Sequence, residues 1–172
     1  MRIAVLGGTG ALGSGLVKRW SNAGHSVTIG SRDPARGKPA AEALGVDIAG
    51  YAEAVAGAQV AALTVPSASQ IKILTTVRDA LEGKILIDTT VPLVPPKVSR
   101  VQLPPEGSAA QRAEVCFGSG VRVVSAFQNV GAKHLHTGEL IDSDVLPRDD
   151  ARDDGSPDRV RRTTANPAHH PV

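Results

Sequence analysis

Short apolar runs alternate with amphipathic stretches along most of the chain. The runs are mostly continuous, as in strands that a sheet buries on both faces, and they lie at 3–6, 27–29, 46–48, 59–65, 84–88 and 121–126. The stretches between them repeat apolar residues at helical spacing, as Leu12, Leu16 and Val17 do. Strands that alternate with helices over short connections predict an α/β fold, a doubly wound parallel sheet with helices on both faces.

Two of the predicted helices begin with a capping-box pattern. In such a box, a serine and a glutamine three residues later satisfy each other's unpaired backbone N–H groups. One box pairs Ser67 with Gln70 and opens a helix that Gly83 closes. The other pairs Ser108 with Gln111 and opens the next predicted helix.

The composition of the chain changes abruptly at Pro147. The chain has 172 residues, of which 41% are hydrophobic, enough for one domain with a buried core. From Pro147 to Val172, however, it has no leucine, isoleucine, phenylalanine or methionine. Such a stretch buries too little apolar surface to offset the entropy of ordering it. We therefore predict one domain over residues 1–146 and a low-complexity, disordered tail over residues 147–172.

Charge and residue usage exclude several classes of partner. A formal net charge of +2 and a total of four aromatic side chains predict no nucleic-acid surface. No apolar run approaches the ~18 residues of a membrane-spanning helix, so no membrane is expected as a partner. The single cysteine, Cys116, excludes an internal disulfide and is typical of a reducing compartment. Since no secretion leader precedes the first apolar run, the sequence predicts a cytoplasmic protein.

A glycine-rich motif follows the first predicted strand. The residues Gly8-Thr9-Gly10-Ala11-Leu12-Gly13 match G-x-G-x-x-G between a buried strand and an amphipathic helix. In this motif the first glycine permits a tight turn, the second lets the backbone approach a pyrophosphate, and the third packs helix against strand. The free N–H groups and the positive end of the helix dipole then face the phosphates. The motif therefore predicts a Rossmann-like dinucleotide site.

The end of the second predicted strand favours NADP over NAD. An NAD site places an acidic residue there, whose carboxylate accepts from the ribose 2′-OH. This chain has Ser31 and Arg32 instead, a hydroxyl and a guanidinium that suit a 2′-phosphate. Arg36 and Lys38 follow on the next turn and add positive charge. Asp33 departs from this pattern, and we interpret it as the cap of the helix that begins at the following proline.

These residues, with several later segments, resemble the coenzyme F420-dependent NADP oxidoreductases, also called NADPH-dependent F420 reductases. The resemblance extends to about residue 146. The matching segments are Gly7-Gly8-Thr9-Gly10-Ala11-Leu12-Gly13, Gly24-His25, Ile29-Gly30-Ser31-Arg32, Leu63-Thr64-Val65-Pro66, Ile87-Asp88-Thr89-Thr90-Val91-Pro92-Leu93 and Val124-Ser125-Ala126-Phe127-Gln128-Asn129-Val130. The glycine motif is generic, whereas Gly30-Ser31-Arg32 together with the later segments is fairly specific to the family.

The resemblance implies hydride transfer between NADP(H) and the deazaflavin coenzyme F420. It implies that the NADP phosphates are held by Thr9 to Leu12, Ser31, Arg32 and Arg36. It implies that the nicotinamide half of the site is lined by Pro66, Ser67 and Ala132. It also implies contacts to the deazaflavin from Gln128, where relatives can carry a histidine, and from Val130. The two coenzymes are the implied partners, and a homodimer is the implied assembly.

No group of residues predicts proton-transfer catalysis or a metal site. Two cofactor rings exchange a hydride once the protein brings them face to face in a dry slot, so no catalytic side chain is expected. His134 and His136 are close in sequence but have no further ligands beside them, so we interpret them as loop or surface histidines. Cys116 is interpreted as a small core residue. Asp88 ends a strand at the ligand-binding edge of the sheet and either orients the following loop or takes part in the chemistry.

From Pro147 onward the chain departs from the family, whose C-terminal strand and helical segment are missing or replaced. Our hypothesis for this departure is a truncation or a shifted reading frame. Two alternatives to the F420-dependent enzyme therefore stay open. One is a non-catalytic NADP(H)-binding module or truncated remnant. The other is an NADP-dependent reductase of a small imine or carbonyl, which would need a proton donor that the sequence does not offer.

Overall fold

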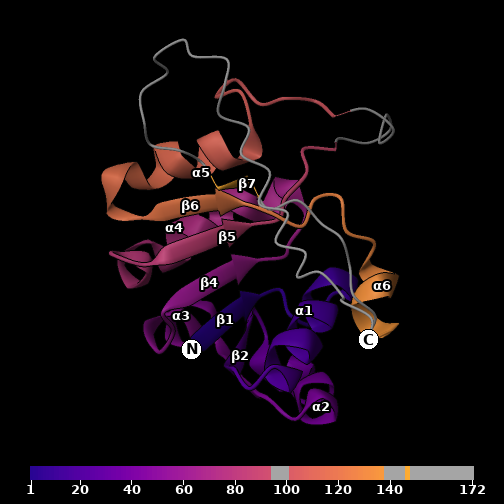
Figure 1. Ribbon diagram of the computed structural model, residues 1–172. Helices are drawn as coiled ribbons and strands as arrows, with labels where there is room; N and C mark the ends of the chain where they lie inside the picture. The colour runs from indigo at the N-terminus through magenta and orange to yellow at the C-terminus, as the bar shows by residue number, and fades with distance from the viewer. Residues whose placement is uncertain (94–100, 138–145, 148–172) are drawn as a thin grey trace, which may run out of the picture.

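A parallel sheet forms the centre of the molecule (Figure 1), which we describe from a computed structural model. The structure describes residues 1–93, 101–137 and 146–147. The strands lie in the order β3-β2-β1-β4-β5-β6-β7. Their bounds are β1 (Arg2–Leu6), β2 (Ser26–Ser31), β3 (Asp47–Gly50), β4 (Val60–Leu63), β5 (Ile85–Asp88), β6 (Arg122–Ser125) and β7 (Leu146–Pro147). The first six strands run parallel, and β7 pairs antiparallel with β6.

The strand order reverses direction at β1. The chain moves outward from β1 to β2 and β3, then returns to pair β4 with the other side of β1, where Leu6 lies opposite Leu63. In open α/β sheets a crevice forms at such a switch point, outside the carboxyl ends of the strands. The fold thus places the ends of β1, β2 and β4 around one crevice.

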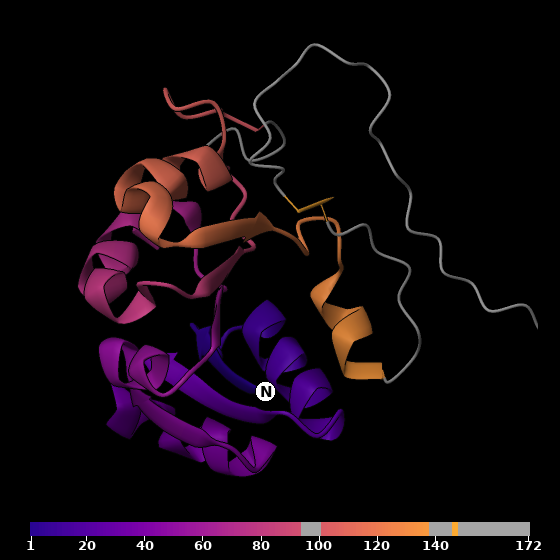
Figure 2. The same cartoon turned by 60° about the vertical axis from the view of Figure 1, so that its left-hand side comes forward.

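Helices cover both faces of the sheet (Figures 1 and 2). The helices are α1 (Ala11–Asn22), α2 (Pro34–Leu44), α3 (Tyr51–Ala56), α4 (Gln70–Leu81), α5 (Ala109–Phe117) and α6 (Ala132–Thr137). Alternate side chains of β1 point to opposite faces. Ile3 and Val5 pack with Val17 of α1 and Ala41 of α2. Ala4 and Leu6 pack in the cluster that includes residues of α3, α4 and α5.

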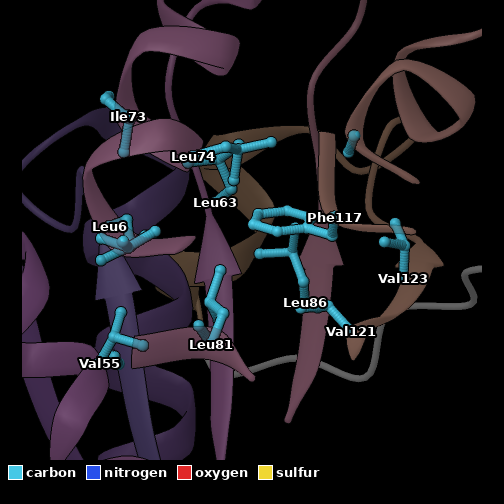
Figure 3. Packing of buried hydrophobic residues seen from close by; sticks show 14 of the residues in the cluster. Leu6, Val55, Leu63, Ile73, Leu74, Leu81, Leu86, Phe117, Val121 and Val123 are labelled. Atoms are coloured by element: carbon cyan, nitrogen blue, oxygen red, sulfur yellow. The ribbon is translucent and has the colours of Figure 1, made fainter. Parts of the chain in front are cut away.

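The larger of the two cores lies between the sheet and α3, α4 and α5. Figure 3 shows Leu63, Leu74 and Leu86 gathered there beside Phe117, which reaches in from α5. Leu63, Leu74 and Leu86 are fully shielded from solvent. Burial of side chains of this size stabilises a fold by about 1.5–3 kcal/mol each. These contacts hold the strand ends rigidly in place around the crevice.

The predicted doubly wound parallel sheet is confirmed. The expected cap at Ser108 is also present, because its hydroxyl accepts from the N–H of Gln111 at 3.1 Å. The box between Ser67 and Gln70 is wrong: Ser67 begins a 3-10 turn, η1 (Ser67–Ser69), ahead of α4. The reason is that the Gln70 side chain turns into the protein, where it is fully buried and bonded to other partners.

Of the predicted tail over residues 147–172, the structure describes Pro147, which pairs with Val124 in β7. The rest lies outside the described residues, so the domain boundary near residue 146 stays a prediction. Within residues 1–93, 101–137 and 146–147, no helix has the length and apolar character needed to cross a membrane.

Candidate functional site

A cavity of about 860 Å³ opens at the crevice between the ends of β1, β2 and β4. This volume lies within the range of about 300–1,000 Å³ that is usual for ligand and cofactor pockets. Five of the residues expected at the coenzyme line it: Thr9, Ser31, Arg32, Arg36 and Pro66. The structure therefore brings together in one cavity three segments that lie apart in the sequence: the glycine loop, the end of β2 with the start of α2, and the turn after β4.

The glycine loop between β1 and α1 makes a tight turn. Gly7, the residue before the motif, adopts a φ of +88° and donates to the carbonyl of Gly30 at 3.0 Å. The turn was expected to need its freedom at Gly8, but Gly8 has no positive φ. Gly8 is required for another reason, since a Cβ there would lie 2.9 Å from the side chain of Ile29.

Gly13 brings α1 close to this loop. A Cβ at Gly13 would lie 2.6 Å from the carbonyl oxygen of Gly7 and 2.8 Å from the Cα of Gly8. The first turn of the helix can therefore lie directly against the loop backbone only because position 13 has no side chain. Close packing at the third glycine was expected from the motif.

The N-terminus of α1 is suited to an anion. Its N-cap is Gly10, no side chain caps it, and its first turn holds no acidic residue. Thr9, Gly10 and Ala11 are exposed, and Leu12 is half-buried. The first N–H groups of a helix lack partners within the helix, and the helix dipole adds positive potential there. The residues present thus fit the pyrophosphate of a dinucleotide.

The end of β2 adds positive charge to the same cavity. Arg32 and Arg36 are exposed, and neither forms a salt bridge with any other residue that the structure describes. The Ser31 hydroxyl accepts from the N–H of Asp33 at 3.1 Å, which leaves its hydrogen available for an acceptor. This arrangement fits a 2′-phosphate better than a bare ribose hydroxyl.

Two charged residues next to these arginines have other partners. Asp33, which departs from the expected NADP pattern, caps α2 by accepting from the N–H of Arg36 at 3.0 Å. Lys38 was expected at the coenzyme but does not line the cavity. It lies one turn further along α2 and approaches Glu42 at 3.9 Å, an i,i+4 pair on the exposed face.

The sequence did not single out two other residues of the cavity wall. Tyr51 begins α3 directly after β3, and Lys72 lies in the first turn of α4. Both elements follow the carboxyl ends of parallel strands, α3 after the edge strand β3 and α4 after β4. Placement after such a strand was the signal that could have found them, because ligands bind at this edge of an α/β sheet.

The remaining expected residues lie beyond this cavity. Ser67 follows Pro66 in η1, and Ala132 begins α6. Gln128 lines a smaller cavity of about 270 Å³, together with Thr90, Ser125 and apolar residues of the loop after β5. Val130 lies outside both cavity walls, and its N–H donates to the carbonyl of Phe127 at 3.3 Å.

The short helix α6 is anchored on α1. Arg19 donates to the carbonyl oxygens of Leu135 and His134, at 2.9 and 2.8 Å, and Lys18 donates to that of His136. These cations sit at the negative end of the α6 dipole. The two histidines therefore lie on a helix, not in a loop, and both are exposed, as expected of surface histidines. Among the described residues, no group of histidine, cysteine and carboxylate side chains could hold a metal ion.

Backbone strain occurs next to Gln128. Phe127 has a φ of 68°, the one positive φ of a non-glycine residue in the described part of the chain. Its ring packs edge-to-face against Trp20 with ring centroids 6.1 Å apart. Strained conformations of this kind cost about 1–3 kcal/mol and cluster at ligand sites. The strain coincides with the segment that the family resemblance places beside the deazaflavin.

Asp88 ends β5 and is 1% exposed. One carboxylate oxygen accepts from the N–H of Thr90 at 2.9 Å, and the other accepts from the amide of Gln70 at 2.6 Å. Burial raises the pKa of the Asp88 carboxyl, although these bonds and the charge of Arg112 act in the opposite direction. These contacts agree with the interpretation that Asp88 orients the loop after β5.

Replacing Asp88 by asparagine is expected to lower the free energy of unfolding by about 1–3 kcal/mol, although it removes a buried charge. The cause is geometric, because Thr90 and Gln70 both donate to the Asp88 carboxylate. An asparagine side chain has one oxygen to accept with, so its NH₂ group would face one of these two donors. Because the pKa of Asp88 is raised in the folded state, its stabilisation is complete below the ordinary pKa and is lost as pH rises through the folded pKa. The penalty of Asp88→Asn should therefore shrink as pH rises from the ordinary aspartate pKa of about 4 through the raised pKa of the folded state.

Urea unfolding of the wild type and of Asp88→Asn across that pH range measures this penalty. The exposed Asp79→Asn is the matched control. A penalty that grows with pH would contradict the raised pKa.

Comparison with known proteins adds the family context of this site. Residues 2–92 match the family described as NADP oxidoreductase, coenzyme F420-dependent. The chain is 43% identical to the F420-dependent NADP reductase of Methanothermobacter marburgensis over 169 residues, covering 89% of this chain and 75% of that protein. It is 40% identical to the F420-dependent NADP reductase of Methanothermobacter thermautotrophicus over 167 residues, covering 89% and 72%.

Solved structures show the same fold. A structure from Arthrobacter sp. FB24, provisionally assigned as an F420-dependent NADP reductase, is 33% identical with a TM-score of 0.66. The match covers 76% of this chain but 64% of that protein, so this chain spans less than two thirds of it. An imine reductase from Bacillus cereus, 21% identical with a TM-score of 0.60, shares the fold alone.

Proposed function

This chain belongs to the coenzyme F420-dependent NADP oxidoreductase family, and from that premise we propose that it transfers a hydride between NADP(H) and the deazaflavin F420. The activity of the whole relatives is a proposal for this chain, because it spans 72–75% of the length of two of them. The observation that carries the proposal is the joint presence of the glycine loop and the Ser31-Arg32 pair in one cavity.

The phosphate end of NADP(H) is assigned to that cavity. Thr9 to Leu12 would hold the pyrophosphate at the start of α1 through N–H groups other than that of Gly10, which already donates to the carbonyl of Gly7 at 2.9 Å. Ser31, Arg32 and Arg36 would bind the 2′-phosphate, which an NAD site with its acidic residue would repel. Selectivity for NADP(H) over NAD(H) is thus supported by the positive charge of the two arginines as well as by the family to which the chain belongs.

The ring end is assigned to the carboxyl ends of β4, β5 and β6. Pro66, Ser67 and Ala132 would face the nicotinamide, while Gln128 and Val130 would face the deazaflavin. The bound coenzymes supply the hydride chemistry, and the protein supplies orientation and exclusion of water. Within the described residues the one buried carboxyl group belongs to Asp88, and its hydrogen bonds are to Thr90 and Gln70. This suits a reaction that needs no proton-transfer residue.

The assay that tests this function mixes the full chain with NADPH and oxidised F420 and follows loss of the deazaflavin's visible absorption. Turnover that depends on both coenzymes is expected. NADPH binding without turnover would overturn the proposed enzymatic activity and favour a non-catalytic NADP(H)-binding module. Turnover with a small imine or carbonyl instead of F420 would favour the other alternative. The homodimer and the cytoplasmic location stay predictions, and light scattering of the purified chain measures the former.

A further inference from the structure

Arg112 links α5 to the turn that follows β4. Its Nη2 donates to both the carbonyl oxygen and the hydroxyl of Ser67, at 3.1 and 2.9 Å. Its Nε donates to Oε1 of Gln70 at 2.6 Å. The guanidinium is planar and forked, so three bonds from one half-buried group fix the peptide plane of Ser67 and its side-chain rotamer together.

Gln70 passes this constraint to the sheet. Arg112 can only donate, so Oε1 of Gln70 faces it and the NH₂ group of Gln70 faces the other way. That nitrogen lies 2.6 Å from Oδ2 of Asp88 and 2.8 Å from the carbonyl of Ala109, the first residue of α5. Gln70 is fully buried, and a buried amide with every group satisfied has a single preferred orientation.

The same strand end also positions Gln128. Its Nε2 donates to the carbonyl oxygen of Asp88 at 2.8 Å and to the hydroxyl of Ser125, also at 2.8 Å. Asp88 therefore accepts a hydrogen bond from Gln70 at its carboxylate and another from Gln128 at its main-chain carbonyl oxygen. Ser67, assigned to the nicotinamide, is thus connected to the end of β5 through Arg112 and Gln70. Gln128, assigned to the deazaflavin, is bonded to the same strand end directly.

The turn that Arg112 holds is otherwise supported by main-chain hydrogen bonds. The N–H of Ser69 donates to the carbonyl of Pro66 at 2.8 Å and the N–H of Gln70 donates to the carbonyl of Ser67, while no side chain caps the start of α4. Among these bonds, those from Arg112 are the ones that also fix the Ser67 side chain. Pro66, the residue just before the anchored serine, lines the large cavity. The Ser67 hydroxyl accepts from Arg112, which leaves its hydrogen available for an acceptor.

We propose that Arg112 is a positioning residue for hydride transfer, which holds Ser67 and the Pro66 turn in the orientation that the nicotinamide ring needs. This rests on the proposed NADP(H) site. Arg112 acts through Ser67 and Gln70 and belongs to neither the glycine loop nor the Ser31-Arg32 pair. Its loss is therefore expected to disturb the ring end of the coenzyme and spare the phosphate end.

The test compares Arg112→Met, which removes the fork at similar length, with Arg112→Lys, which keeps the charge. Arg78→Met on the exposed face of α4 is the matched control. Affinity for adenosine 2′,5′-bisphosphate, which has no nicotinamide, measures the phosphate end. The rate of F420 reduction with NADPH, and its isotope effect with deuterated NADPH, measure the ring end.

For Arg112→Met we expect bisphosphate affinity within about twofold of wild type and hydride transfer slowed by about 10–100-fold, because misplacement of reacting groups by ~1 Å has effects of this size. The isotope effect should rise, since hydride transfer then limits the rate. Arg112→Lys should recover part of the rate, and Arg78→Met should match wild type. Equal losses of bisphosphate affinity and rate, or an unchanged rate and isotope effect, would overturn the proposal.

A second measurement separates this proposal from the proposed function. The fluorescence of NADPH reports the surroundings of its nicotinamide and needs no turnover. If the wild type binds NADPH but does not reduce F420, an altered emission of NADPH bound to Arg112→Met, with bisphosphate affinity retained, still supports the role of Arg112. Unchanged emission would overturn it. If Arg112→Met does not fold cooperatively, Arg112→Lys decides by the same two measurements.

Discussion

Replacing Arg32 by alanine is expected to weaken NADPH binding by about 10–100-fold while changing NADH binding by less than about threefold. The guanidinium lines the cavity at the end of β2 and has no acidic partner among the residues that the structure describes. A hydrogen bond to a charged group contributes about 1.5–3 kcal/mol, which corresponds to this loss of affinity. NADH has no 2′-phosphate, so it loses no such bond.

Titration of both coenzymes by fluorescence measures the two affinities. Lys38→Ala is the matched control, since Lys38 carries the same charge on α2 but lies outside the cavity wall near Glu42. It should change neither affinity by more than about twofold, as expected for an exposed pair. An equal loss of NADPH and NADH affinity in Arg32→Ala would show that Arg32 does not recognise the 2′-phosphate.

Gly13→Ala is expected to lower the stability of the fold, whereas Gly10→Ala is expected to lower the affinity for NADPH. A Cβ at Gly13 would lie 2.6 Å from the Gly7 carbonyl and 2.6 Å from the Thr64 hydroxyl. Backbone must move to admit it, so the free energy of unfolding should fall by about 2–3 kcal/mol. Gly10 has φ −76° and ψ 168°, which alanine adopts freely, and the nearest atom to its Cβ is the Gly7 carbonyl at 3.3 Å.

Gly10→Ala should therefore unfold within about 1 kcal/mol of wild type but lose more than about tenfold in NADPH affinity, because its methyl group occupies the approach of the pyrophosphate. Urea unfolding and NADPH titration of both variants give the two quantities. A stable Gly13→Ala protein, or full NADPH affinity in Gly10→Ala, would contradict the roles assigned to these glycines.

The sequence predicted the parallel sheet because its signals are local. Continuous apolar runs such as 59–65 mark buried strands, and the glycine motif marks the first strand-to-helix turn. Ser31 and Arg32 could be placed at a ligand-binding edge for the same reason, since they directly follow a predicted strand. For these residues, whose placement depends on their position at the end of one strand, the sequence was enough.

Roles that depend on contacts between elements were missed. Gln70 fits a capping box by spacing, yet its amide lies between Arg112 and Asp88, from parts of the chain that only the fold brings together. The positive φ at Gly7 instead of Gly8 is a local feature, but two adjacent glycines give no sequence signal that distinguishes them.

The order in which this sheet can assemble follows from its pairing. Neighbours from β1 to β6 run parallel, so each pairing needs a crossover connection and no hairpin can start it. At the switch point, Leu6 accepts a hydrogen bond from Thr64, 58 residues further along the chain. Closing loops of this length before any contact compensates for them slows folding. The crevice that faces the glycine loop exists only after this distant pair has met, so a refolding chain gains its coenzyme-binding surface late. Coenzyme added during refolding would therefore stabilise the finished fold without accelerating the steps that precede it.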